Sequence, residues 1–474
     1  MITIKEKKFL VVGLGKSGVA CARFLKARGG VVTATDGKSI DGLGEDIQKL
    51  KDLGIKIEAG GHNIETFLDC DLIVLSPGVP MSIEPIREAK KRGIEVISEI
   101  ELAYNFIKTP IVAITGSNGK TTTTTLVGQI LKRAHKEVFV GGNIGNPLIE
   151  YIELGREAEY VVAEISSFQL EGIRSFRPRV VIMLNISPDH LDRYLSYQDY
   201  IAAKARIFLN QREGDFAVLN ADDSLVSEMT NSFKDVRKVY FSQKKKINKG
   251  IYLDGNSIVS EISGQKHCYS TEFFKIRGVH NIDNIMASIA AAEICRCNPG
   301  DIQDAVNSFK GLEHRLEFVE EISGVKYYND SKATNIGAVE KSLESFEQPI
   351  ILIAGGRDKG TGYESLNELV KKRVKKLILI GEAKEIILKS LGSLTQSLKA
   401  DTLEEAVELA WLESSHGDVV LLSPACSSYD MFNNYEERGE AFKATVRKLK
   451  SKTDNRIGVT IQVGTKAQST KGTK

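Results

Sequence analysis

The eight residues Thr115–Thr122, Thr-Gly-Ser-Asn-Gly-Lys-Thr-Thr, most strongly limit the folds available to this chain. They follow the apolar run Ile111–Ile114, which predicts a buried strand, and lead into Thr123–Ala134, which predicts a helix. A glycine-bearing turn between a strand and a helix points backbone N–H groups at a phosphate. The general phosphate-loop pattern has glycine where this chain has Ile114, so only its Gly-Lys-Thr end is met. The order of elements favours nucleotide binding over a chance surface loop.

Four side chains in and after this loop are candidates for phosphate and magnesium chemistry. Lys120 is placed to reach the β- and γ-phosphates, and the Thr121 hydroxyl to bind Mg²⁺. Glu164 ends a buried-type strand, where a carboxylate beside a phosphate loop holds Mg²⁺ directly or through water. His190 follows a later strand, and its roles as metal ligand and as capping residue stay equally open. The residues expected to cradle the nucleotide are Gly116, Ser117, Asn118, Gly119, Lys120, Thr121 and Thr122.

The length and charge of the chain limit its class. Its 474 residues exceed one core and predict about three domains. A net charge of +2 argues against nucleic acid or a membrane surface as the main partner. No apolar run is long enough to span a membrane, and the N-terminus lacks the plan of a signal peptide. Six cysteines without a completing metal-ligand cluster predict reduced thiols. We therefore expect a cytoplasmic protein without membrane insertion or nucleic-acid binding.

Residues 1–108 alternate strand-like and helix-like segments and form the first expected domain. Gly13–Gly18 is a full G-x-G-x-x-G after a strand, and Asp36 follows about 20 residues on, where a ribose-binding carboxylate would lie. On the residues alone NAD binding is the default interpretation, although the motif shows only that a diphosphate meets a helix N-terminus. A tight turn without a ligand is the alternative. Lys16 and Lys38 add positive charge suited to any nucleotide diphosphate.

We place a second domain at 109–311 and a third at 312–452. The strands expected in the third domain are Val325–Tyr328, Ile350–Ala354, Lys376–Ile380 and Val419–Leu422. Each ends in a polar or glycine-containing loop, which predicts a parallel sheet with a functional rim. The remaining residues, 453–474, are rich in Lys, Thr, Ser and Gly and predict a disordered tail. The expected fold is α/β with three domains: Rossmann-like, a central P-loop ATPase-type mostly parallel sheet, and Rossmann-like again.

Five sequence blocks occur together in one order. They are Thr-Gly-Ser-Asn-Gly-Lys-Thr at 115–121, Glu-Ile-Ser-Ser-Phe-Gln-Leu at 164–170, His-Arg at 314–315, Asn-Asp-Ser-Lys-Ala-Thr-Asn at 329–335 and Ser-Pro-Ala-Cys-Ser-Ser at 423–428. With them, residues 1 to about 450 resemble the Mur ligase family of bacterial cell-wall synthesis. The resemblance implies an ATP-dependent amide-bond ligase, in which a substrate carboxylate is phosphorylated and an amine attacks the acyl phosphate. It is closest to the members that add D-glutamate to UDP-N-acetylmuramoyl-L-alanine.

The same resemblance implies the roles of individual residues. The implied catalytic residues are Lys120, His190, Lys204 and Lys332, with Lys204 carbamylated so that it offers a carboxylate-like metal ligand. The implied ligands of two Mg²⁺ ions are Thr121, Glu164, His190 and Lys204. ATP would meet Asn281, Asn284, Arg315 and Asp330. The UDP-sugar would meet Lys16, Ser17, Asp36, Gly37, Lys38, Ser76, Gly78, Asn143 and Gln169. D-glutamate would meet Lys359, Ser428 and Tyr435.

Two departures from one D-glutamate-adding member of the family stand out. That member has Phe where this chain has Tyr435, and Thr-Arg where this chain has Gly37-Lys38, which leaves the uridine contacts less certain than the ATP contacts. Alternatives are another Mur ligase, a folylpolyglutamate synthase-like ligase, and a non-catalytic nucleotide-binding switch. The Ser423–Ser428 block and the complete first domain argue against the folate enzyme. The polar rim of the third domain argues against a switch. We expect a monomer that closes around its substrates.

Overall fold

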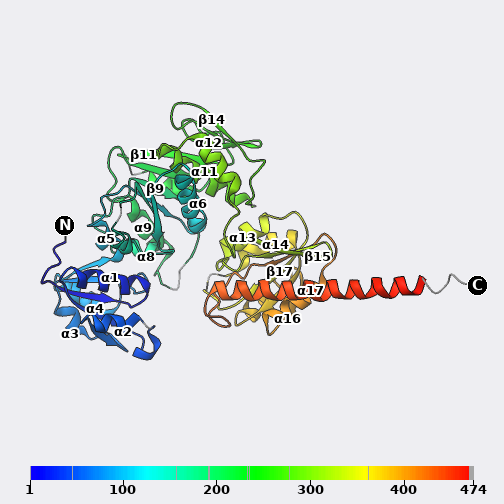
Figure 1. Ribbon diagram of the computed structural model, residues 1–474, viewed down its shortest axis with the longest axis horizontal. Helices are drawn as coiled ribbons and strands as arrows, with labels where there is room; N and C mark the ends of the chain where they lie inside the picture. The colour runs from blue at the N-terminus through cyan, green and yellow to red at the C-terminus, as the bar shows by residue number, and fades with distance from the viewer. Residues whose placement is uncertain are drawn as a thin grey trace, which may run out of the picture. The chain divides into compact units, whose positions relative to one another are not determined.

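A computed structural model describes residues 2–468 except 45, 156, 190–192, 232, 234, 277 and 361, with the backbone alone at 279, 280 and 454–468 (Figure 1). It contains three sheets and divides into two compact units. The first unit is Met1–Ser187, Arg193–Phe274 and Ile282–Phe309, and the second is Pro188–Asp192, Lys275–Asn281 and Lys310–Lys474. The α/β fold with three mostly parallel sheets that the sequence predicts is confirmed. The boundaries near residues 108 and 311 stay predictions.

The first sheet is entirely parallel, with strand order β3-β2-β1-β4-β5. Its strands are β1 (Lys8–Val12), β2 (Val31–Asp36), β3 (Lys56–Ala59), β4 (Leu72–Leu75) and β5 (Glu95–Ser98). Helices α1 (Lys16–Ala27), α2 (Asp46–Asp52) and α5 (Glu99–Tyr104) contribute to the core on one face, and α3 (Ile64–Leu68) and α4 (Glu84–Lys91) to the core on the other. Phe9 and Val11 belong to the first core and Leu10 and Val12 to the second, because successive strand side chains alternate between faces.

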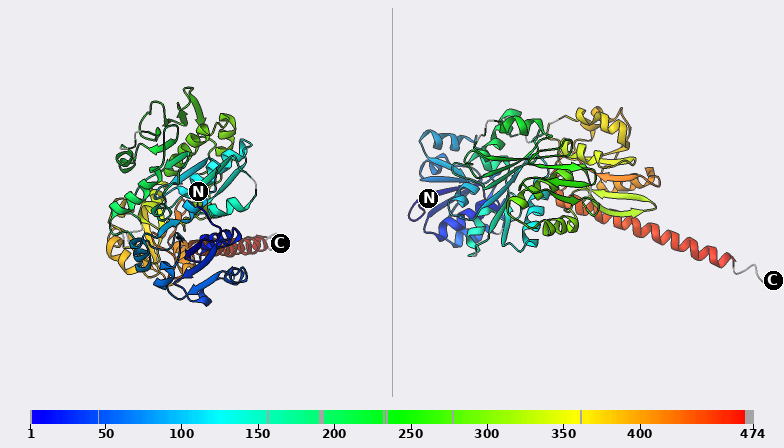
Figure 2. Two further views of the ribbon diagram at one scale, coloured as in Figure 1. Left: turned by 90° about the vertical axis from the view of Figure 1, so that its left-hand side faces the viewer. Right: turned by 90° about the horizontal axis from the view of Figure 1, so that it is seen from above.

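The central sheet has nine strands in the order β14-β13-β12-β11-β10-β9-β6-β8-β7, drawn from cyan to green in Figure 2. They are β6 (Ile111–Thr115), β7 (Val138–Gly142), β8 (Tyr160–Glu164), β9 (Val180–Met183), β10 (Phe216–Asn220), β11 (Arg237–Ser242), β12 (Ile251–Asp254), β13 (Ser257–Ser260) and β14 (His267–Ser270). The helices are α6 (Lys120–Arg133), α7 (Leu148–Glu153), α8 (Ser167–Glu171), α9 (Tyr197–Ala205), α10 (Ser224–Thr230), α11 (Val279–Ile294) and α12 (Pro299–Ser308). Pairing is parallel from β7 through β12 and antiparallel for β13 and β14. The strand that leads into the phosphate loop, β6, therefore has a parallel neighbour on each side.

The first two sheets share one apolar core. Phe24 of α1, Ile100 of α5 and Leu148 of α7 belong to the same cluster of buried side chains. The Glu99 carboxylate at the start of α5 accepts a hydrogen bond from the Ile149 amide at 2.8 Å. Burial raises the pKa of Glu99 to about 7. This continuous core explains why the first two sheets form a single compact unit.

The third sheet has the order β15-β16-β20-β17-β18-β19, in which only β15 is antiparallel to its neighbour. Its strands are β15 (Glu317–Ile322), β16 (Val325–Asn329), β17 (Ile350–Gly355), β18 (Val374–Ile380), β19 (Gln396–Lys399) and β20 (Val419–Leu422). Helices α13 (Ile336–Glu344), α14 (Asn367–Arg373) and α15 (Lys384–Leu391) cover one face, and α16 (Leu403–Glu413) and α17 (Tyr435–Gln468) the other (Figure 1).

The sequence-based prediction differs from the structure at two edge strands of the third domain and in the segment after Lys452. It does not predict the two edge strands, β15 and β19, because half-exposed edge strands lack the continuous apolar run of the central ones. It also predicts disorder after Lys452, whereas α17 continues to Gln468. No proline interrupts the helix between Tyr435 and Gln468, so the chain has no strong helix breaker there.

Two further sequence expectations can be compared with the structure. All six cysteines are free thiols, as the sequence predicts. Across the part of the chain that the structure describes, no helix combines the length and the apolar character that crossing a bilayer requires.

Candidate active site

The loop between β6 and α6 has the strand–turn–helix order that the sequence predicts. Gly119 precedes the first turn of α6 with φ of +84°, a left-handed conformation that favours glycine. A Cβ atom at Gly119 would lie 2.2 Å from Asn284 Oδ1, so a side chain there would also displace the Asn284 amide. The Lys120 ammonium donates to the carbonyls of Gly116 at 2.8 Å and Ser117 at 2.7 Å. Lys120 thus lies against the loop whose amides begin the helix.

The loop after β9 supports the phosphate loop from one side. Asn118 N donates to Asn185 Oδ1 at 2.8 Å, and Asn185 Nδ2 donates back to the Asn118 carbonyl at 3.1 Å. The Ser117 hydroxyl lies 2.9 Å from both the Ser187 carbonyl and the Tyr200 hydroxyl. Neither Asn185 nor Tyr200 is predicted as a site residue from the sequence. Only the position of Asn185 immediately after an apolar strand hints at such a role.

Glu164 is the clearest candidate for a metal ligand. It ends β8 directly beside Ile114 of β6, and its side chain is 2 % exposed. Glu164 Oε1 accepts from Asn143 Nδ2 at 2.9 Å, whereas Oε2 has no hydrogen-bond partner among the described residues. A buried carboxylate oxygen without a partner is costly, so it fits a site for a cation. Thr121, in the first turn of α6, adds a hydroxyl oxygen of the kind Mg²⁺ prefers. His190 lies outside the described residues.

Lys204 lies against the same loop. Its side chain on α9 is 1 % exposed, and the ammonium donates to the Gly116 carbonyl at 2.8 Å. The same nitrogen lies 4.8 Å from the centroid of the Tyr200 ring, within reach of a cation–π interaction. A solvated helical lysine is the ordinary expectation from sequence position, and the structure instead buries this amine beside the phosphate loop.

Asn284 and Gln169 also face polar neighbours. Thr123 Oγ1 donates to Asn284 Oδ1 at 3.3 Å, which ties α11 to the start of α6. Gln169 Oε1 accepts from Ser166 N at 3.0 Å and caps α8, while its Nε2 has no partner among the residues described. This buried amide nitrogen remains able to donate to a ligand. Asn281 is buried on the same helix as Asn284.

The predicted diphosphate loop of the first domain is held together by side chains from neighbouring strands. Asp36 at the end of β2 accepts from Leu14 N at 2.6 Å and Lys38 N at 2.9 Å. The Ser76 hydroxyl donates to the Gly13 carbonyl at 2.6 Å. Lys16 donates to the Gly145 carbonyl at 2.6 Å. The remaining predicted residues, Ser17, Gly37 and Gly78, follow the same three strands, β1, β2 and β4.

Replacing Gly18 with alanine is expected to destabilise the protein by about 3 kcal/mol, because overpacking against backbone is not relieved by side-chain rotation. A Cβ at Gly18 would lie 1.8 Å from the Gly13 carbonyl oxygen and 2.7 Å from Ser76 Oγ. Gly15→Ala is the matched control, since nothing lies within 4 Å of a Cβ there. Urea denaturation of both variants measures the difference. Equal stability of the two would contradict the close packing of this loop.

In the third domain, the predicted amino-acid-binding residues have defined surroundings. The Lys332 ammonium lies 3.5 Å from the centroid of the Tyr435 ring. Lys359 Nζ lies 3.8 Å from Asp189 Oδ1, a pairing that the sequence analysis does not predict. Ser428 is buried, and its carbonyl accepts from Phe432 N at 2.8 Å at the start of a turn.

Asp330 follows β16 and is enclosed. Its oxygens accept from the hydroxyls of Ser342 at 2.5 Å and Ser423 at 2.8 Å and from Leu316 N at 3.2 Å. Burial raises the pKa of Asp330 to about 6, and the hydrogen bonds oppose the rise only in part. The Asp330 carboxylate thus links three segments of the domain interior by hydrogen bonds, in addition to any contact with a nucleotide.

Asp330 is expected to make stability fall as the pH rises from 4 to 6. In that range the folded protein keeps a proton on Asp330, with its pKa of about 6, that the unfolded chain has already released near pH 3.9. The free energy of unfolding of Asp330→Asn, taken relative to that of the wild type, should therefore rise by about 2 kcal/mol between pH 4.5 and pH 7. Urea denaturation at both pH values tests this, with exposed Asp41→Asn as the control. A difference between Asp330→Asn and wild type that is independent of pH would contradict it.

Comparisons with known proteins agree with this arrangement. Three family models match: the Mur ligase MurD-like N-terminal domain at residues 7–98, the Mur ligase middle domain at 114–292, and the Mur ligase glutamate ligase domain at 314–426. The chain is 56% identical over 446 residues to UDP-N-acetylmuramoylalanine--D-glutamate ligase of Geotalea daltonii, covering 94% of this chain and 98% of that one. The same-named protein of Geotalea uraniireducens is 55% identical over 444 residues, with 94% and 98% covered.

A solved structure supports the fold. The pseudomurein peptide ligase type C of Methanothermus fervidus aligns with a TM-score of 0.60 at 21% identity, over 94% of this chain and 100% of that one. The parallel sheets, the phosphate loop and the buried carboxylate beside it fit a nucleotide-binding α/β enzyme, and the matching family models make that enzyme a ligase. The chain belongs to the Mur ligase family. Mur ligases use ATP and Mg²⁺.

Proposed function

We propose that the protein joins D-glutamate to the L-alanyl carboxylate of UDP-N-acetylmuramoyl-L-alanine in peptidoglycan synthesis. ATP phosphorylates that carboxylate, the amine of D-glutamate attacks the acyl phosphate, and phosphate leaves, so that ADP and phosphate accompany the new amide. The observation that carries the proposal is the phosphate loop with the buried, partly unpartnered Glu164 one strand away. The identity of the substrates is supported by the name of relatives that match almost the full chain.

Charge neutralisation is the main requirement of the first step, because a phosphoryl group moves between anions. Lys120 is proposed to hold the β- and γ-phosphates. Two Mg²⁺ ions at Thr121, Glu164, His190 and Lys204 would supply further positive charge. Asn281, Asn284, Arg315 and Asp330 are proposed to bind the adenosine and phosphates of ATP.

The remaining roles concern the two other substrates. The first domain is proposed to bind the UDP group through Lys16, Ser17, Asp36, Gly37, Lys38, Ser76 and Gly78, with Asn143 and Gln169 toward the sugar. The unpartnered Gln169 Nε2 supports a donor role there. Lys359, Ser428 and Tyr435 are proposed to bind D-glutamate, with the Lys359 cation facing a carboxylate. Lys332 would lie near the reacting atoms.

Carbamylation of Lys204 is part of the proposal. An unmodified ammonium is a poor neighbour for Mg²⁺, whereas a carbamate offers anionic oxygens. Its buried position beside the Gly116 carbonyl would shield the modification from bulk water. Native mass spectrometry with and without bicarbonate tests this. Lys204→Arg is the control, whose mass bicarbonate should not change. If bicarbonate leaves the mass of the wild-type protein unchanged as well, the proposed metal site contains no carbamate.

Phosphate release tests the function as a whole. ATP, Mg²⁺ and UDP-N-acetylmuramoyl-L-alanine are supplied with D-glutamate, L-glutamate, L-lysine or diaminopimelate in parallel. The proposal expects release with D-glutamate alone. Release with another amino acid would keep the ligase chemistry and overturn the assignment of Lys359, Ser428 and Tyr435. Absence of release with all four would favour a nucleotide-binding switch.

The protein is further proposed to act in the cytoplasm and to be a monomer. Light scattering of the purified chain tests the monomeric state.

A further inference from the structure

Arg315 lies between two residues with left-handed backbone. His314 has φ of +62° and Leu316 has φ of +44°. Residues other than glycine rarely adopt this backbone conformation, and it persists only where neighbouring groups hold it. In the part of the chain that the structure describes, this is the one place where two such non-glycine residues are separated by a single residue. The backbone that presents Arg315 is therefore held by its surroundings rather than by its own preference.

Three hydrogen bonds fix the backbone on both sides of Arg315. His314 N donates to Glu317 Oε2 at 2.9 Å, and the His314 carbonyl accepts from Lys332 N at 3.1 Å. Leu316 N donates to Asp330 Oδ1 at 3.2 Å. The carboxylate of Glu317 is thus one of the groups that hold the strained segment.

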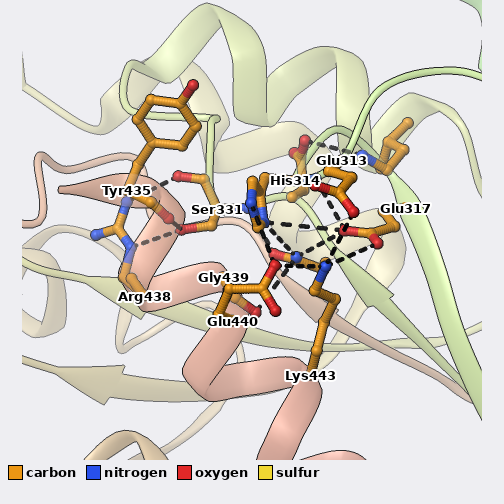
Figure 3. A network of polar contacts seen from close by, with 12 residues as sticks. Glu313, His314, Glu317, Ser331, Tyr435, Arg438, Gly439, Glu440 and Lys443 are labelled. Atoms are coloured by element: carbon orange, nitrogen blue, oxygen red, sulfur yellow. Dashed lines mark hydrogen bonds and ion pairs between the residues drawn. The ribbon is translucent and has the colours of Figure 1, made fainter.

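Helix α17 holds Glu317 in turn. Lys443 is 4 % exposed, and its ammonium lies 2.6 Å from Glu440 Oε1, 3.2 Å from Glu317 Oε1 and 3.7 Å from Glu313 Oε1. Figure 3 shows these carboxylates and His314 gathered around Lys443. The ammonium supplies the cation that the Glu313, His314 and Glu440 cluster would otherwise require, so we assign the cluster no metal.

The helix approaches His314 closely at Gly439. A Cβ atom there would lie 2.1 Å from His314 Nδ1, and the same nitrogen lies 2.9 Å from Asn329 Nδ2. Asn329 Nδ2 also donates to Glu317 Oε2 at 3.0 Å. The His314 ring therefore lies between α17 and the end of β16, beside the Glu317 carboxylate with which Lys443 pairs.

We propose that Lys443 is a positioning residue for Arg315. Lys443 lies on α17 and pairs with Glu317 of β15. This pairing keeps the backbone of residues 314–316 in the conformation that presents the Arg315 guanidinium. It does so without touching ATP. The inference rests on the proposed binding of the ATP phosphates by Arg315.

The test is the KM for ATP of Lys443→Met, measured by phosphate release from the full-length protein with UDP-N-acetylmuramoyl-L-alanine and D-glutamate. KM is expected to rise about tenfold, the effect of one hydrogen bond to a charged group, with kcat and the KM for D-glutamate little changed. Lys450→Met is the matched control. Lys450 lies on α17, as Lys443 does, and pairs at 2.7 Å with Glu320 of β15, the strand that contains Glu317. Loss of the Lys450 ammonium should leave the KM for ATP unchanged.

Arg315→Ala and the double variant Arg315→Ala/Lys443→Met separate positioning from general damage. If Lys443 acts through Arg315, the double variant has the same KM for ATP as Arg315→Ala. A second, independent rise would overturn the inference, as would a wild-type KM in Lys443→Met. Should Lys443→Met fail to fold, Glu317→Gln replaces it. This change keeps the shape and substitutes an NH₂ group for one acceptor oxygen, and it must also raise the KM for ATP.

Failure of the underlying proposals is distinguishable. A wild-type protein without turnover overturns the proposed function and the inference together. Wild-type turnover with a normal KM for ATP in Arg315→Ala overturns the role of Arg315 and hence the inference. A raised KM in Arg315→Ala with a normal KM in Lys443→Met overturns the role of Lys443 alone.

Discussion

Lys120→Met is expected to lower kcat for phosphate release by about 10³-fold, the range seen when a preorganised positive or hydrogen-bonding group is removed from a phosphoryl or acyl transfer site. Methionine keeps much of the length of the side chain but removes its charge. The variant also loses the hydrogen bonds from Lys120 to the carbonyls of Gly116 and Ser117, so the loop is less restrained. Both effects act against in-line transfer between two anions.

Lys132→Met provides the control for Lys120→Met. Lys132 is exposed in the last turn of the same helix, α6, at the end away from the phosphate loop. It should keep wild-type turnover, and circular dichroism should show that both variants fold. If Lys120→Met turned over within about tenfold of wild type, the charge of Lys120 would not be the main stabilising element of phosphoryl transfer.

Glu164→Gln is expected to raise the Mg²⁺ concentration needed for half-maximal activity by about 10- to 100-fold. Glutamine has the shape of glutamate, and its oxygen can still accept from Asn143 Nδ2, which lies 2.9 Å from Glu164 Oε1. The change therefore removes negative charge at the unpartnered Oε2 without opening a cavity. Isothermal titration with Mg²⁺ in the presence of ADP measures binding independently of turnover.

Glu159→Gln is the control for this metal prediction. Glu159 is exposed and immediately precedes β8, at the opposite end of the strand from Glu164. Its replacement should leave the Mg²⁺ requirement unchanged. An equal Mg²⁺ requirement in Glu164→Gln and wild type would mean that the buried carboxylate serves only the structure of the loop containing Asn143.

Much of the fold could be predicted from the chain because the central strands are short apolar runs followed by glycine or polar residues. Ile111–Ile114, Tyr160–Ala163 and Ile350–Ala354 all lie in strands of the structure. Such runs are characteristic of parallel strands buried on both faces. The edge strands β15 and β19 could not be predicted in this way, since one face or edge of each lies outside the core.

The local order of strand, glycine turn and helix determined by itself that Thr115–Thr122 contains the turn from a strand into a helix N-terminus, because the periods of the flanking segments and the freedom of glycine are local properties. Tertiary structure decided what surrounds that loop. Lys204 reaches the Gly116 carbonyl from 88 residues away, and Lys443 reaches Glu317 from 126 residues away. A sequence carries no local signal for such pairs, since burial and partners arise only when the sheets and helices pack together.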